Sequence, residues 1–152
     1  MIISKLRKIM SPTYLLIFLI LSIVFHLIVP IKSVIVKPYN LLGIIFISIG
    51  IWFNIQTDNL FRKNETTVKP EGETSVLIIS GPFKYSRHPM YLGMLLITIG
   101  MGILLGSIAS FLPSLSFSLV LEFIFVRFEE DKLEKVFGQE YIKYKKKVRS
   151  WI

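Results

Sequence analysis

The sequence predicts an all-α fold, a polytopic membrane bundle of about four transmembrane helices with a C-terminal amphipathic helix. Hydrophobic residues make up 53% of the 152 residues, which is more than a soluble domain of this size needs to fill its core. They occur in four long apolar runs. Basic residues flank these runs, as expected where helix ends meet anionic lipid headgroups. The length fits a single membrane-embedded domain, residues 1–152.

Each apolar run approaches the ~20 residues with which a helix crosses about 30 Å of hydrocarbon. The first run follows a basic stretch and has no small-residue cleavage site after it, so we expect a retained span. The third and fourth runs are separated by so short a turn that they must form a helical hairpin. Pro113 is expected to interrupt the fourth run near its start. The predicted spans are residues 12–29, 39–55, 90–105 and 108–126.

Basic residues are distributed unevenly among the connections. They are frequent before the first run, between the second and third runs and after the fourth, whereas the first two runs are separated by only Lys32 and Lys37. The positive-inside rule therefore places both termini and the middle loop in the cytoplasm. We expect a multi-pass protein of the cell (cytoplasmic) membrane whose net charge of +8 serves contact with membrane lipids and not with nucleic acid.

The middle loop and the tail carry the remaining predicted structure. A β-branched run from Ser75 to Ser80 predicts a short extended segment, which Gly81-Pro82 ends in a turn. From Glu129 onward, apolar and aromatic residues recur every three or four positions, which predicts an amphipathic helix at the bilayer surface or packed on the bundle. Gly138 is a weak point in that helix. The apolar stripe consists of Leu133, Phe137, Tyr141, Tyr144, Val148 and Trp151.

The composition excludes several kinds of chemistry. The chain has no cysteine, which excludes disulfides, thiolate catalysis, cysteine-ligated zinc and iron–sulfur clusters. Its two histidines, His26 and His88, lie far apart in sequence, so we expect no metal site. His26 is predicted to form a hydrogen bond between helices. The spacing Gly102-x-x-x-Gly106 indicates close helix packing.

Polar residues gather where the middle loop enters the third span. The segment from Gly81 to Gly93 contains arginine, histidine, serine and two tyrosines, all able to bind a polar ligand at headgroup level. Pro89 suits the first turn of a helix, where free amides favour an anionic group. The alternative is a basic and aromatic belt of the kind found at many membrane helix ends.

A second polar group follows the fourth span. Its three negative charges are unfavourable at a helix C-terminus and near anionic lipid, unless a cationic ligand or hydroxyl groups compensate for them. The three acids are Glu129, Glu130 and Asp131. The alternative is that they pair with neighbouring basic residues or begin the tail helix. Because both polar groups lie at the same end of one hairpin, we predict that they face each other across a single pocket.

Two motifs resemble a known family. The string GPFKYSRHPMYLG at 81–93 and the tail EEDKL followed by FGQEY at 137–141 resemble motifs of the isoprenylcysteine carboxyl methyltransferase family and its phospholipid methyltransferase relatives. They stand in the family's order and bracket the hairpin, and the resemblance covers roughly residue 66 to the end. The chain departs from the family at Val148-Arg149, where Val-Pro is usual.

The resemblance implies an S-adenosylmethionine-dependent methyltransferase acting on a lipid-like or small amphiphilic acceptor, of the isoprenylcysteine carboxylate or aminophospholipid class. It implies a cofactor region at about 66–93 and 127–152. His88 and Glu130 are candidate bases for an amine acceptor, and Arg127 resembles an arginine assigned to substrate. The cofactor-binding positions that carry over are Ser75, Val76, Leu77, Ile78, Phe83, His88, Pro89, Met90, Tyr91, Glu129 and Glu130.

Two other functions stay open at this point. One is a non-catalytic membrane scaffold of the same fold. The other is a related membrane reductase that uses a nicotinamide cofactor. The acid pair and the short loop favour the methyltransferase.

Overall fold

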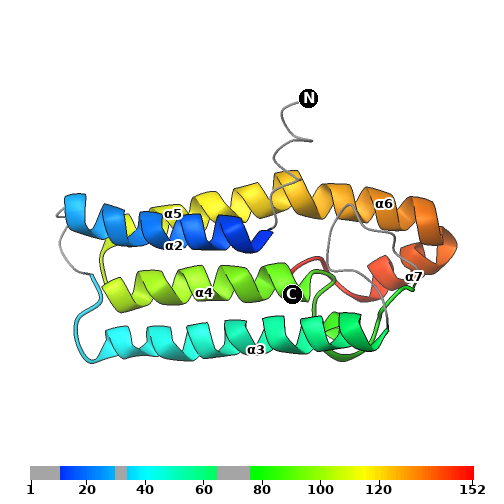
Figure 1. The fold of residues 1–152 in the computed structure, drawn as a ribbon, viewed down its shortest axis with the longest axis horizontal. Helices are drawn as coiled ribbons and strands as arrows, with labels where there is room; N and C mark the ends of the chain where they lie inside the picture. Colours follow the sequence, from blue (N-terminus) through cyan, green and yellow to red (C-terminus); the bar gives the residue numbers. More distant parts are fainter. Residues whose placement is uncertain (1–10, 30–33, 65–75) are drawn as a thin grey trace.

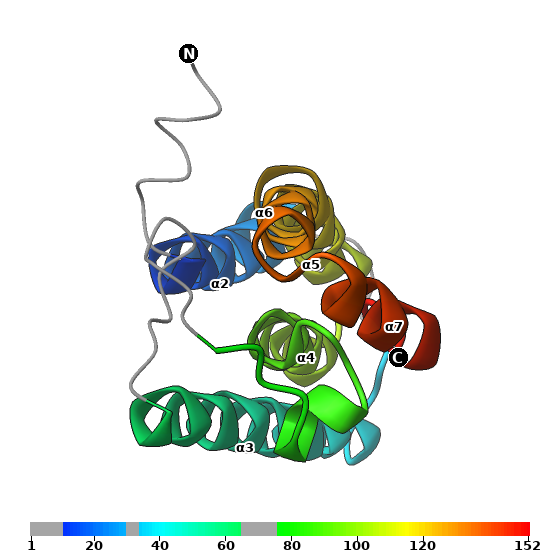
Figure 2. The same cartoon turned by 90° about the vertical axis from the view of Figure 1, so that its right-hand side faces the viewer.

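A computed structural model describes residues 11–29, 34–64 and 76–152. All regular secondary structure within these ranges is helical, which confirms the predicted fold class. Four long helices lie side by side and alternate in direction (Figure 1). The view along the bundle in Figure 2 shows α4 at its centre, and α4 contacts each of the other three. Their bounds are α2 Ser11–Ile28, α3 Leu42–Lys63, α4 Pro89–Leu105 and α5 Ile108–Val120.

Three helical stretches are long and apolar enough to cross a membrane, namely Ser11–Ile28, Tyr39–Lys63 and Ile108–Phe137, and α4 is a shorter apolar helix. Helix α3 continues beyond the second predicted span, residues 39–55, and ends at Lys63. Polar side chains remain in this helix by bonding to its own backbone. Asn54 donates to the Gly50 carbonyl at 2.9 Å, and Thr57 donates to the Phe53 carbonyl at 2.7 Å.

Helices α3 and α4 approach closely at two pairs of glycines. A Cβ atom on Gly50 would lie 2.5 Å from the Gly93 carbonyl oxygen, and one on Gly43 would lie 2.4 Å from the Gly100 carbonyl oxygen. Only glycine permits this separation of the two backbones.

The predicted close helix packing is confirmed at Gly102 but not at Gly106. Gly102 faces the Phe111 ring of α5, where a Cβ would come within 2.9 Å. Gly106 instead ends α4 with a positive φ of 73°, and its carbonyl accepts bonds from the amides of Val34 and Ile35. The hairpin turn between α4 and α5 is thus confirmed.

The fourth span is one continuous helix of 30 residues. It comprises α5, a π-helical turn η3 (Leu121–Val126) and α6 (Arg127–Phe137). The expected interruption at Pro113 was wrong: Pro113 is buried inside α5, which continues past it. Proline costs a helix one backbone hydrogen bond, and the packing of α5 against α2 and α4 can offset that loss. At 1.5 Å per residue the helix is about 45 Å long, so α6 projects beyond ~30 Å of hydrocarbon.

The tail folds back onto the middle loop. The single helix predicted for the tail is divided into two helices, α6 and α7 (Gln139–Lys147). The division occurs at Gly138, which adopts a φ of 51° between them. Tyr141 and Tyr144 are buried with Ile78 and Phe83. Of the two placements considered for the apolar stripe, the structure shows packing on the protein. Phe83 belongs to a short 3-10 helix, η2 (Gly81–Lys84), and no strand forms in the described part of the preceding loop.

The opposite end of the bundle is tied together by polar side chains. His26 of α2 lies 2.9 Å from the Ser107 hydroxyl at the start of α5, as predicted for a residue bonding between helices. Asn40 donates to the Leu104 carbonyl at 3.2 Å. These contacts hold both α2 and the start of α3 against the turn between α4 and α5.

Candidate functional site

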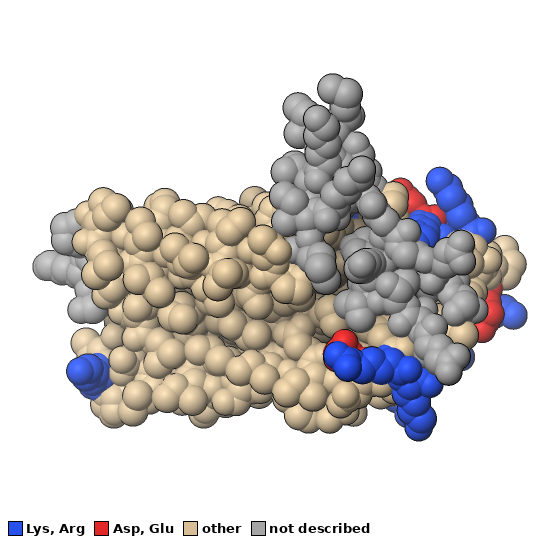
Figure 3. All heavy atoms as spheres, viewed as in Figure 1, with Lys and Arg blue, Asp and Glu red and all other residues tan. Residues whose placement is uncertain are grey.

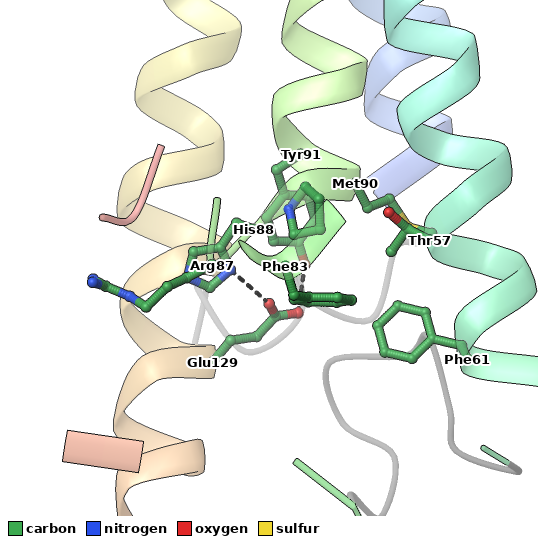
Figure 4. A pocket seen from close by; sticks show the side chains of 9 residues that line it. Thr57, Phe61, Phe83, Arg87, His88, Met90, Tyr91 and Glu129 are labelled. Carbon is green, nitrogen blue, oxygen red and sulfur yellow. Dashed lines mark hydrogen bonds and ion pairs between the residues drawn. The ribbon is translucent and has the colours of Figure 1, made fainter. Parts of the chain in front are cut away.

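A pocket lies at the end of the bundle where the middle loop meets α4 and α6 (Figure 4). It encloses about 300 Å³ of empty space, which includes space open to solvent. Its walls come from α3, η2, the start of α4 and α6. The lining residues are Thr57, Phe61, Phe83, Arg87, His88, Pro89, Met90, Tyr91 and Glu129.

The entry into α4 is a rigid corner. His88 is the residue before the helix, and Pro89 is its first residue, where no backbone donor is needed. The Ser86 hydroxyl accepts a hydrogen bond from the His88 amide at 3.1 Å and donates to the Ser150 carbonyl at 2.9 Å. Ser86 and His88 are both almost fully buried. This corner fixes the direction in which His88 and Tyr91 project.

Glu129 is the carboxylate that faces the pocket. The Tyr91 hydroxyl donates to its Oε1 at 2.5 Å, and His88 Nδ1 lies 3.4 Å from its Oε2. The His88 and Tyr91 rings are stacked, with centroids 5.8 Å apart. The Glu129 side chain keeps 21% of its surface exposed. It can therefore accept further hydrogen bonds from a ligand while its position is held by two buried rings.

Glu130 is held by the protein itself. Arg87 donates to Glu130 Oε1 from Nε at 3.0 Å and from Nη2 at 2.5 Å. Lys145 Nζ lies 3.1 Å from Glu130 Oε2, and His88 Nε2 lies 3.4 Å from Oε1. Glu130 does not line the pocket, although it is adjacent to Glu129 in sequence.

His88 lies between the two carboxylates, and their contacts shift its pKa. Burial disfavours the protonated ring, but the hydrogen bonds and charges of Glu129 and Glu130 outweigh burial and raise the pKa of His88 above its usual value. In its protonated form the imidazole donates from both nitrogens, which suits it to orient the two carboxylates.

Aromatic and apolar side chains form the opposite wall. The Phe61 and Phe83 rings meet edge to face with centroids 5.8 Å apart, and Thr57 and Met90 lie beside them (Figure 4). The Phe83 backbone is held from behind by Tyr144, whose hydroxyl donates to the Phe83 carbonyl at 2.6 Å. Burial raises the pKa of Tyr144 to about 12, so this donor keeps its proton. A cleft with aromatic faces and one carboxylate suits a ligand with a flat ring and cationic or hydroxyl groups.

The structure brings together six of the predicted residues, and these are Phe83, His88, Pro89, Met90, Tyr91 and Glu129. Other predicted residues lie elsewhere. Val76, Leu77 and Ile78 do not line the pocket, and Ser75 lies outside the described residues. Arg127 is 64% exposed, with its guanidinium over the Phe123 ring and its Nε 4.0 Å from Glu122 Oε1.

Sequence reasoning missed three of the lining residues. Thr57 and Phe61 belong to the part of α3 beyond the predicted end of the second span. Arg87 was predicted as one of the polar side chains able to bind a ligand, but it was not among the cofactor-binding positions. The full burial of Thr57 is visible only in the structure, and its sequence position gave no signal for a role in the site.

Comparisons with known proteins agree with this picture. The model of the phospholipid methyltransferase family matches residues 39–140. A protein-S-isoprenylcysteine O-methyltransferase of Schizosaccharomyces pombe is 40% identical over 80 residues, which cover 51% of this chain and 33% of that protein. An uncharacterized protein of Haemophilus influenzae is 41% identical over 63 residues, which cover 41% of this chain and all of that protein. No solved structure gives a significant match.

Proposed function

Because this chain belongs to the phospholipid methyltransferase family, we propose that it is a membrane methyltransferase that transfers a methyl group from S-adenosylmethionine to a lipid-like or small amphiphilic acceptor. The observation that carries the proposal is the meeting of Glu129 with His88 and Tyr91 in one pocket beside an aromatic wall. The chain spans a third of the S. pombe relative, so the acceptor named for that protein is a candidate here and no more.

The chemistry of the pocket fits this cofactor. S-adenosylmethionine combines a flat purine, ribose hydroxyls and a cationic sulfonium. Phe61 and Phe83 offer aromatic surface for the purine, and the exposed part of Glu129 offers a carboxylate for hydroxyl or cationic groups. When bound, the cofactor supplies an electrophilic methyl group for an in-line displacement.

The protein's own contribution is alignment and electrostatics. His88 and Tyr91 hold Glu129 in place, so that it need not reorganise when a cation is bound. A carboxylate acceptor needs no base but only desolvation and alignment. An amine acceptor must lose a proton, and the predicted bases His88 and Glu130 are both engaged in ion pairs. These contacts favour an acceptor that arrives with its nucleophilic atom unprotonated. Arg127 does not line the pocket, so any contact that it makes with the acceptor lies outside the pocket.

We place the pocket end of the bundle in the cytoplasm. On the face seen in Figure 3, lysines and arginines gather mainly at this end. Lys37 lies at the opposite end, because it follows α2 and precedes α3. The positive-inside rule supports this orientation, and with it the placement of both termini on the cytoplasmic side of the cell membrane.

The proposal is tested with purified protein in lipid nanodiscs, S-adenosylmethionine labelled in its methyl group, and two probe acceptors. One is phosphatidylethanolamine and the other is a farnesylated cysteine derivative. We expect label in one of them, and the identity of the labelled probe assigns the acceptor class. Absence of label from both probes and from a whole lipid extract, with well-folded protein, would overturn the proposal.

A further inference from the structure

We propose that Arg87 is a positioning residue that fastens the segment Val148–Trp151 across the corner as a strap, and that this strap holds His88 and Tyr91 in place for ligand binding. The inference rests on the proposed function for the identity of the ligand. It assigns a role to two residues, Arg87 and Trp151, that the cofactor-binding motif does not explain.

The first end of the strap is bound at Arg87. The Arg87 amide donates to the Arg149 carbonyl at 3.0 Å. Its Nη1 donates to the Val148 carbonyl at 2.6 Å and to the Lys145 carbonyl at 3.2 Å. Ser86 adds the bond to Ser150 described above. Two of these acceptors, the Val148 and Lys145 carbonyls, bond to the guanidinium. Its other two nitrogens donate to Glu130, and the single ammonium of lysine cannot reproduce this spread of donors.

The second end of the strap is bound at Trp151. Its indole Nε1 donates to Glu122 Oε2 at 3.0 Å, within the π-helical turn of the fourth span. Its ring packs against the apolar cluster that contains Tyr91 and Phe125. The Tyr91 and Phe125 rings are themselves in contact, with centroids 5.8 Å apart. The strap therefore runs from the corner before His88 to the packing behind Tyr91.

Both ends of the strap act on the two rings that hold Glu129. Arg87 immediately precedes His88, and Trp151 supports the cluster in which Tyr91 is packed. In Figure 4 the Arg87 side chain points away from the Phe61 and Phe83 rings. Its side chain is 8% exposed, and the guanidinium donates to Glu130 and to the Val148 and Lys145 carbonyls. Although Arg87 borders the pocket, its donors are therefore engaged by the protein, and it acts on a ligand through its neighbours.

A simpler role for Arg87 would be to neutralise Glu130. Removing one partner of a buried ion pair leaves an uncompensated charge and destabilises the fold, whereas removing both partners avoids that cost. The double variant Arg87→Met/Glu130→Gln separates the two roles. It removes the charge pair together with the guanidinium's bonds to the Val148 and Lys145 carbonyls, and glutamine can still accept from His88.

The experiment measures S-adenosylhomocysteine affinity by calorimetry and thermal stability in detergent. We expect Arg87→Met/Glu130→Gln to melt close to the wild type but to bind S-adenosylhomocysteine about 10- to 100-fold more weakly, as for a displaced binding group. Arg87→Lys and Trp151→Ala should also weaken binding. The controls are Arg62→Met, which removes an exposed pair with Asp58, and Trp52→Ala, which removes a lipid-facing indole. Wild-type affinity in the double variant would overturn the proposal.

A second readout is independent of the ligand. The chain has two tryptophans, so Trp52→Phe leaves Trp151 as the reporter. In that background, Arg87→Met/Glu130→Gln should shift Trp151 emission to longer wavelength as the strap is released, and an unchanged spectrum would refute the strap. If the wild type binds no S-adenosylhomocysteine, the proposed function fails, and the emission experiment still decides on the strap.

Discussion

Glu129 and Glu130 are adjacent in sequence and differ in what surrounds them. Arg87, Lys145 and His88 all contact Glu130, whereas Glu129 has two ring partners and faces the pocket. Glu130 thus bonds within the protein, whereas Glu129 stays available to a ligand. Sequence alone predicted that this pair matters, but it cannot separate the two roles, since the partners of Glu130 come from residues more than 10 positions away on either side of it.

Glu129→Gln tests the ligand-binding acid. The amide keeps the shape and the Tyr91 hydrogen bond but loses the charge. We expect S-adenosylhomocysteine affinity to fall by roughly 1.5–3 kcal/mol, about 10- to 100-fold, the usual strength of a hydrogen bond to a charged group. Calorimetry measures it. Glu134→Gln is the matched control, since its carboxylate is exposed and pairs with Lys145. Equal affinities of the two variants would remove Glu129 from the site.

The raised pKa of His88 predicts a pH dependence of stability. The folded state favours protonated His88, so its contribution is complete below the unfolded pKa of about 6.5 and is lost as pH rises through the higher folded-state pKa. The difference in melting temperature between wild type and His88→Gln should therefore be largest near pH ~6 and shrink toward pH ~9. A difference that grows with pH would contradict the protonated assignment.

At the scale of the elements, the glycine contacts between α3 and α4 set how closely the pocket walls approach. Gly50→Ala should force the helices apart, because its Cβ would lie 2.5 Å from the Gly93 carbonyl oxygen. Overpacking of this kind costs about 1–3 kcal/mol. Thermal melting in detergent measures it, with Ser48→Ala on the exposed face of α3 as control. Equal melting temperatures would show that the two helices do not pack as described.

Apolar runs predicted the spans because lipid selects for them, and the bounds of α2 and α4 were close to those predicted. The end of α3 was missed for a physical reason. Asn54, Thr57 and Asp58 lower the local hydropathy, yet helical structure continues because the first two bond to carbonyls of the preceding turn. The predicted site therefore lacked Thr57 and Phe61, which lie beyond the predicted end of the second span.

The strap could not be predicted from sequence patterns either. Arg87 bonds to carbonyl oxygens 58 and 61 residues away, and backbone acceptors leave no trace in side-chain identity. Gly138 was recognised as a weak point, but not as the place where the chain turns. The two motifs could be recognised in the sequence because they contain polar residues next to apolar spans. Their proximity in the structure could be predicted because the hairpin lies between them.

At the scale of the whole molecule, the alternating helices bring the charged segments to one end. The absence of cysteine from the sequence allows a direct test of orientation. Lys143→Cys at the pocket end and Lys37→Cys at the opposite end are both exposed positions. In sealed spheroplasts, a membrane-impermeant maleimide should label the Lys37→Cys variant and spare the Lys143→Cys variant until the cells are lysed. The reverse pattern would invert the proposed topology.

The central claim is that the Arg-His-Pro corner and Glu129 enclose one binding site for S-adenosylmethionine. Photo-crosslinking of labelled S-adenosylmethionine to purified protein, followed by peptide mapping, tests it most directly. The account predicts label within residues 83–91 or next to Glu129, reduced by S-adenosylhomocysteine and unaffected by a reduced nicotinamide nucleotide. Label confined to other segments, or protection by the nicotinamide nucleotide alone, would contradict it.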